Sequence, residues 1–122
     1  MRPIIEKSKE IDKIKIYLSL FKLQKSYLLL ISDQENRGIG NVTLGSPPTI
    51  EGMKASSVTH QLFGVQRKLL SKIIVEKTSS YLNAPVLLLL FLKLVENENE
   101  IAKTLILFLN EALDEISNTN DK

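Results

Sequence analysis

The longest apolar stretch of the chain runs without a break from Val86 to Leu92, within the segment PVLLLLFLKL. A strand with one face in water alternates apolar and polar positions, so this run predicts a central strand that is covered on both faces. A membrane-spanning helix would need about 20 largely apolar residues. The chain becomes polar at Glu96, which makes the stretch too short for a span. A buried helix is the other alternative, because Pro85 suits the start of either element.

Ahead of this run, apolar residues at every second position predict strands. The shared face of the first strand comprises Ile14, Ile16, Leu18 and Leu20. The segment YLLLIS at residues 27–32 predicts a second strand that forms a hairpin with the first. A third, weaker strand is expected at Ile39–Leu44, and a fourth at Val58–Phe63. Residues 1–11 are largely polar and are expected to be flexible.

Two segments have the periodicity of amphipathic helices. The first is expected from about Gln66 to Leu82, and its apolar side comprises Leu69, Leu70, Ile73, Ile74 and Tyr81. The second follows an N-cap at Asn97, for which Glu100 is the reciprocal partner, and extends to about Ile116. Its core stripe comprises Ile101, Leu105, Phe108, Leu109, Ala112, Leu113 and Ile116. Residues 117–122 form a polar tail that is expected to be flexible.

These elements predict an α+β fold, with a mostly antiparallel β-sheet, a buried central strand and two packed α-helices. The 122 residues are expected to form a single domain with one core.

Four apolar residues lie outside the pattern that this core requires. Ile50 and Met53 belong to a loop at residues 45–57 that contains two prolines and two glycines. They either fold back on the core or contact a partner. Ile106 and Leu107 widen the stripe of the last helix beyond what one sheet face needs. These four residues are the candidate partner-binding residues.

The residues that carry most enzyme chemistry are scarce. The chain has no cysteine, which excludes a disulfide scaffold and a thiolate metal site. His60 is the one histidine, and no GxSxG motif accompanies it. The pair Gly38 and Gly40 lacks the third glycine and the lysine of a phosphate-binding loop. We therefore expect no catalytic residue, no metal and no cofactor, and predict that the protein is not an enzyme.

The formal net charge is +2, from 16 basic and 14 acidic residues. This balance leaves no basic stripe of the kind that binds nucleic acid. Lysines do lie near Tyr17, Phe21 and Tyr27, and aromatic residues on a sheet can stack bases. The N-terminus reaches a charge at Glu6 before any apolar segment forms, so no signal peptide is expected. The chain is predicted to be soluble and intracellular, without nucleic-acid or membrane binding.

The order of segments resembles the small proteasome assembly chaperones of the type-three and type-four family, with the type-four member the more similar. That family has an aromatic-containing strand followed by a strand of the form LGNLSVA, a Thr-Thr-Leu-Phe-Gly-like segment, a helix leading into a hydrophobic strand, and a final helix. The corresponding segments here are Tyr27–Ser32, Gly38–Leu44, Thr59–Gly64, Leu70–Thr78, Val86–Leu94 and Ile101–Ile116. A longer connection at Thr78–Pro85 replaces the family's short link before the central strand.

This resemblance implies a non-enzymatic chaperone in the cytoplasm, and in the nucleus as well if the source is eukaryotic. Such a protein pairs with itself or with a sister chaperone, and it holds α-type subunits of the proteasome core while the α-ring forms. Two alternatives remain open from the sequence. One is a nucleic-acid-binding protein that uses a basic and aromatic sheet face, and the other is an interaction scaffold like the roadblock or profilin modules.

Overall fold

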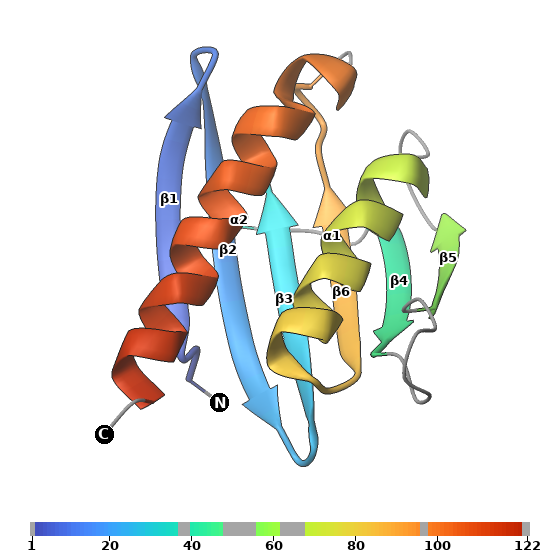
Figure 1. The fold of residues 1–122 in the computed structure, drawn as a ribbon. Helices are drawn as coiled ribbons and strands as arrows, with labels where there is room; N and C mark the ends of the chain where they lie inside the picture. The colour runs from blue at the N-terminus through green and yellow to red at the C-terminus, as the bar shows by residue number, and fades with distance from the viewer. Residues whose placement is uncertain (1, 37–39, 48–55, 62–67, 96–97, 121–122) are drawn as a thin grey trace.

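The computed structural model describes residues 2–36, 40–47, 56–61, 68–95 and 98–120. In this part of the chain, six strands form one sheet and two helices pack against it (Figure 1). The elements in chain order are β1 (Ile5–Ile11), β2 (Ile14–Leu23), β3 (Ser26–Ser32), β4 (Asn41–Ser46), β5 (Ser56–Gln61), α1 (Lys68–Leu82), β6 (Val86–Phe91) and α2 (Glu98–Asn120).

The strand order across the sheet is β1-β2-β3-β6-β4-β5. Every neighbouring pair is antiparallel except β3 and β6, which run parallel. Two parallel strands need a crossover connection, and here β4, β5 and α1 together provide it. Both helices lie over the same face of the sheet (Figure 1). The predicted α+β fold is confirmed, and the apolar run does form a central strand.

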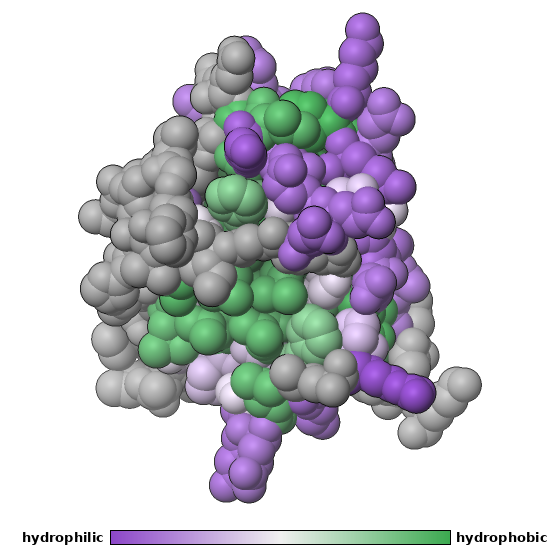
Figure 2. Space-filling view, turned by 180° about the vertical axis from the view of Figure 1, so that it is seen from behind, coloured by the Kyte–Doolittle hydropathy of each residue, from purple (hydrophilic) through white to green (hydrophobic). Residues whose placement is uncertain are grey.

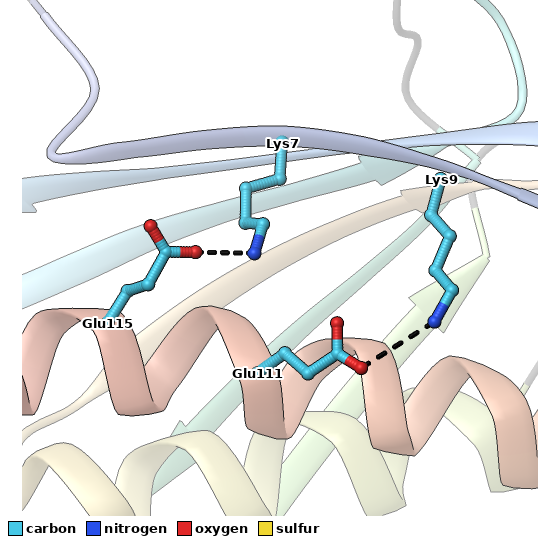
Figure 3. A network of polar contacts seen from close by, with 4 residues as sticks. All are labelled: Lys7, Lys9, Glu111 and Glu115. Carbon is cyan, nitrogen blue, oxygen red and sulfur yellow. Dashed lines mark hydrogen bonds and ion pairs between the residues drawn. The ribbon is translucent and has the colours of Figure 1, made fainter.

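Strand β1 was not expected, because residues 1–11 were predicted to be flexible. Its sequence, IEKSKEI, has charged residues on both faces of the strand, so it lacks the apolar–polar alternation that predicts a strand. On the helix side, Lys7 pairs with Glu115 of α2, and Lys9 Nζ lies 3.6 Å from Glu111 Oε1 (Figure 3). Exposed ion pairs contribute about 0–1 kcal/mol each. The strand is therefore held mainly by its backbone pairing with β2 and by Ile5 and Ile11 at its ends.

The turn that joins β1 to β2 has a definite geometry. Asp12 and Lys13 have φ angles of 50° and 68°. Positive φ at both central residues is the geometry of the type I′ turn, whose twist matches that of two antiparallel strands. The next hairpin, between β2 and β3, is the one that the sequence predicted, with Leu23 opposite Ser26 at its end.

The core lies between the sheet and the helices. Every residue of the predicted α2 stripe is buried, from Ile101 to Ile116, which confirms that prediction. The predicted α1 side is only partly right. Leu70 and Ile74 are buried, but the other three residues are exposed: Leu69 at 58%, Ile73 at 41% and Tyr81 at 44%.

Helix α1 turns a different side toward the sheet than the sequence predicted, because small residues lie at its contact with the sheet. Ser71, Thr78 and Ser79 are fully buried on this helix. Opposite them, a Cβ atom added to Gly45 of β4 would lie 2.7 Å from a methyl carbon of Val75. That distance is far inside van der Waals contact, so the glycine is what lets the helix backbone come close to β4.

One buried carboxylate secures the end of the central strand. Asp33 follows β3 and is 6% exposed. Its Oδ1 accepts hydrogen bonds from the main-chain N–H of Lys93, at 2.9 Å, and from the side-chain amide of Gln34, at 3.1 Å. Its Oδ2 accepts one from the main-chain N–H of Leu94. The chain beyond β6 is thereby tied to the chain beyond β3.

The predicted central strand is buried throughout, but more completely on one face than on the other. Val86, Leu88 and Leu90 are fully buried beneath the helices. The alternate residues, Leu87 and Leu89, point to the other face and are only partly buried.

Candidate protein-binding surface

The face of the sheet that faces away from α1 and α2 carries a continuous set of large apolar side chains. Residues that lie directly opposite each other on paired strands share a face, so the register defines rows across the sheet. The first row is Phe21, Leu28, Leu87 and Leu44, and the second is Ser19, Leu30, Leu89 and Val42. A third, more polar row is Tyr17, Ser32 and Phe91.

We call the apolar members of these rows the open-face patch, which comprises Phe21, Leu28, Leu30, Val42, Leu44, Leu87, Leu89 and Phe91. Leu44 is 51% exposed and the others are partly buried. None of the eight belongs to the core cluster or to the side chains that pack against it. Figure 2 views this side of the molecule and shows apolar surface gathered at its centre, with polar residues along the β1 margin. Soluble monomers rarely leave such contiguous apolar surface in water, and larger patches of this kind mark interaction sites.

The β1 margin of the same face is polar. Here Glu10 lies opposite Lys15, Ser8 opposite Tyr17 and Glu6 opposite Ser19. The ammonium group of Lys15 lies 5.4 Å from the centre of the Tyr17 ring, within the range of a cation–π contact. A cavity of about 250 Å³ opens beside that ring and is lined by Glu6, Lys7, Ser8, Tyr17 and Glu35.

The comparisons with known proteins identify the fold. No protein-family model matches the sequence, and no curated protein matches it. One similar solved structure is the crystal structure of a novel chaperone complex for yeast 20S proteasome assembly, with a TM-score of 0.61. The two chains share one fold. The alignment covers 93% of this chain and 94% of the yeast chain, with 10% sequence identity. At that identity, the likeness establishes the fold and leaves the function to be argued from the surface.

The four candidate partner-binding residues from the sequence do not lie on the open-face patch as far as the structure describes them. Leu107 is 52% exposed on α2, whereas Ile106 is partly buried and packs against the core. Both belong to the helix layer, which lies on the opposite side of the sheet from the open-face patch. Ile50 and Met53 lie outside the described residues. Partner binding by these four residues therefore stays a prediction.

The open-face patch itself was missed by sequence reasoning. The signal for it was the lack of apolar–polar alternation in the central run, which indicates that both faces of the strand are apolar. Such a pattern does not tell whether the second face is covered by this chain or by another protein. The run was interpreted as fully internal.

The structure places two of the three aromatic residues that suggested nucleic-acid binding, Tyr17 and Phe21, on the open face. The third, Tyr27, packs against the core on the helix side, opposite Lys22. Glu6 and Glu10 also lie on the open face, and their charge repels phosphate. Lys15 shares the open face with Tyr17 and Phe21, so it is these acidic neighbours, and the position of Tyr27 on the other face, that make a base-stacking platform a poor fit.

The helix layer has an apolar surface of its own. Leu69 and Ile73 of α1 and Ala102 of α2 border a small hollow of about 40 Å³, together with Leu70 and Asn99. Within the described part of the chain, no group of three or more histidine, aspartate or glutamate residues is arranged to hold a metal ion. Neither α1 nor α2 has the length and apolar character that crossing a bilayer requires.

Proposed function

We propose that this protein is a proteasome assembly chaperone that binds α-type subunits of the core particle and promotes α-ring formation by transient protein–protein contact. The observation that carries this proposal is the open-face patch, a large apolar surface on an otherwise ordinary α+β domain. The fold that it shares with a chain of a yeast chaperone complex for 20S proteasome assembly supports proteasome assembly as the process in which it acts.

In this proposal the open-face patch is the pairing surface, which joins the chain to a second copy or to a sister chaperone. Two sheets pack face to face with about 10 Å between them when the inner faces present interdigitating apolar side chains. The rows through Leu87 and Leu89 supply such side chains from four adjacent strands. A flat apolar face of this kind suits another sheet better than it suits a small ligand, which prefers a concave site.

The helix layer would then remain accessible in the pair. Leu107 is exposed there, and the hollow beside Leu69 and Ile73 adds apolar surface. We propose that this side contacts the α subunit, with Leu107 and Ile106 as contact residues. Ile50 and Met53 are included as contact residues on the strength of the sequence.

The experiment is a pulldown with tagged protein from its own cell extract, followed by mass spectrometry of the retained proteins. We expect enrichment of proteasome α subunits over mature β subunits. Leu107→Glu should reduce that enrichment, whereas Gln24→Glu, which adds the same single charge at an exposed position in the turn between β2 and β3, should not. If no α subunit is enriched, or if retention is lost after nuclease treatment, the proposal is wrong.

A further inference from the structure

The two helices run side by side and expose apolar side chains along the line where they meet. They have the same direction, and their N-terminal ends lie at the same end of the sheet (Figure 1). At that end, Leu69 and Ile73 of α1 and Ala102 of α2 border the hollow of about 40 Å³. Toward the other end, the Tyr81 hydroxyl donates a hydrogen bond of 3.1 Å to Oδ1 of Asp114. We call the strip between the hollow and this hydrogen bond the helix seam.

The dimensions of the helix seam suit an α-helix of another protein. Leu69 and Tyr81 are separated by about three turns of α1, or roughly 18 Å. A third helix that lies along two parallel helices packs its side chains into the hollows between theirs. The hollow of about 40 Å³ has room for the end of an aliphatic side chain, and it is far smaller than the roughly 300–1,000 Å³ of small-molecule sites.

The residues beside the helix seam include two lysines that lack a partner. Lys77 lies four residues from both Ile73 and Tyr81, so it shares their side of α1. Lys103 of α2 lies four residues after Asn99, which lines the hollow. Both lysines are exposed, and neither forms an ion pair within the described residues. The first turn of α1 has no acidic residue, so the partial positive charge of that helix end adds to theirs.

The acidic residues of α2 lie away from the hollow. Glu111 pairs with Lys9 on the β1 side of α2 (Figure 3), and Glu100 lies three turns earlier on that same side. Asp114 lies at the far end of the helix seam, where it accepts the hydrogen bond from Tyr81. The part of the seam next to the hollow is therefore apolar with lysines on both helices, which favours an acidic partner.

We propose that the helix seam receives an amphipathic helix of the bound α subunit, with an aliphatic side chain in the hollow and acidic residues opposite Lys77 and Lys103. Charges on the flanks of an apolar stripe set the choice and orientation of a partner helix. Leu107, the exposed contact residue of the proposed function, follows Lys103 by one turn. The α subunit as the source of the helix rests on the proposed function, whereas the preference for an acidic amphipathic helix rests on the seam alone.

The test uses two helical peptides of about 18 residues as probes, both with leucine at the a and d positions of each heptad. One has glutamate at the e and g positions, and the other has lysine there. Methyl nuclear magnetic resonance of Ile73 in the whole chain reports binding at constant ionic strength. We expect a saturable shift with the glutamate peptide and about tenfold weaker binding of the lysine peptide, because two attractive pairs become repulsive. Equal affinities, or no saturable shift with the glutamate peptide, would overturn the proposal.

Variants locate the site. Lys77→Gln and Lys103→Gln should each weaken binding of the glutamate peptide by about two- to fivefold, the range for one exposed charge pair. Lys72→Gln is the matched control and should leave binding unchanged, because Lys72 is also exposed on α1 but lies about 140° around the helix from Lys77. The double variant Lys77→Glu, Lys103→Glu should prefer the lysine peptide. An equal loss in all three single variants would mean general electrostatic attraction and would refute the site.

Retention of α subunits is measured separately, in the pulldown, and should decrease in the double variant. If the peptides bind as expected but the double variant retains α subunits as well as the wild type does, the α subunit is not the source of the helix and that assignment is refuted. If the wild type retains α subunits but Ile73 does not respond to the glutamate peptide, the helix seam is refuted while the proposed function stands. If the glutamate peptide binds but no α subunit is retained, the proposed function fails while the preference of the seam stands.

Discussion

Adjacent residues of β6 should give opposite results when they are mutated. Leu88 is fully buried under the helices, whereas Leu89 is partly exposed at the centre of the open-face patch, between Leu30 and Val42. Leu88→Ala removes a core side chain and should lower the free energy of unfolding by about 2–5 kcal/mol. For a chain of 122 residues, each kcal/mol corresponds to about 4 °C in the melting temperature. Leu89→Glu should change the unfolding free energy of the separate chain by only about 1 kcal/mol.

The two variants should rank in the opposite order when pairing is measured. A carboxylate at the centre of a covered apolar surface is buried without a partner, which costs several kcal/mol. Leu89→Glu should therefore weaken pairing by about 100-fold or more, whereas folded Leu88→Ala protein should still pair.

The assay combines urea unfolding with sedimentation over a range of protein concentrations. Unfolding is measured where the wild-type chain is dissociated, because pairing raises apparent stability by mass action. Lys22→Glu is the control for added negative charge on a strand of the same sheet. If Leu89→Glu destabilises the dissociated chain as much as Leu88→Ala does, Leu89 is a core residue and the open-face patch is not an interaction surface.

Three further predictions concern the framework that holds this surface. Gly45→Ala should destabilise the chain by about 1–3 kcal/mol in urea unfolding, because the new methyl group meets Val75, and Val75→Ala should relieve part of that cost in the double mutant. Additive costs would show that the two residues do not touch. Asp33→Ala should cost about 1–3 kcal/mol in the same assay, since two main-chain N–H groups beyond β6 lose their acceptor; a neutral result would mean that water replaces the carboxylate. Ser71→Ala should leave the melting temperature unchanged or raise it, because the buried hydroxyl has no hydrogen-bond partner in the described part of the chain, and a clear decrease would reveal one.

Much of the fold could be predicted from the sequence because local periodicity decides which residues are buried. The β2–β3 hairpin, the central position of β6 and the buried stripe of α2 all follow from such patterns. Strand β1 could not be predicted in this way. Its helix-side lysines pair with Glu111 and Glu115 of α2, and Glu115 lies 108 residues from Lys7 in the chain. These ion pairs add little, and the backbone pairing with β2 that mainly holds the strand leaves no apolar alternation in its own sequence.

The candidate site was missed for a different reason. The run from Val86 to Leu92 correctly indicated two apolar faces, but the sequence does not say how many layers cover them. Both described helices pack on one side of the sheet. That arrangement depends on the right-handed crossover between β3 and β6 and on the direction in which α2 returns over β1. Neither is encoded in the run itself.

Alternate residues of β6 lie on opposite faces of the sheet and have different roles. Val86, Leu88 and Leu90 are buried beneath the helices. The core there is closely packed, so it tolerates few other side chains at these positions. Leu87 and Leu89 are not among the described residues that form that core or pack against it, so stability alone does not explain their size or their apolar character. Two polar residues at these positions would give an ordinary half-exposed strand at little cost to the fold. Leucine at both positions, in register with apolar residues on the strands at either side, is what a sheet requires if another protein is to complete its second layer.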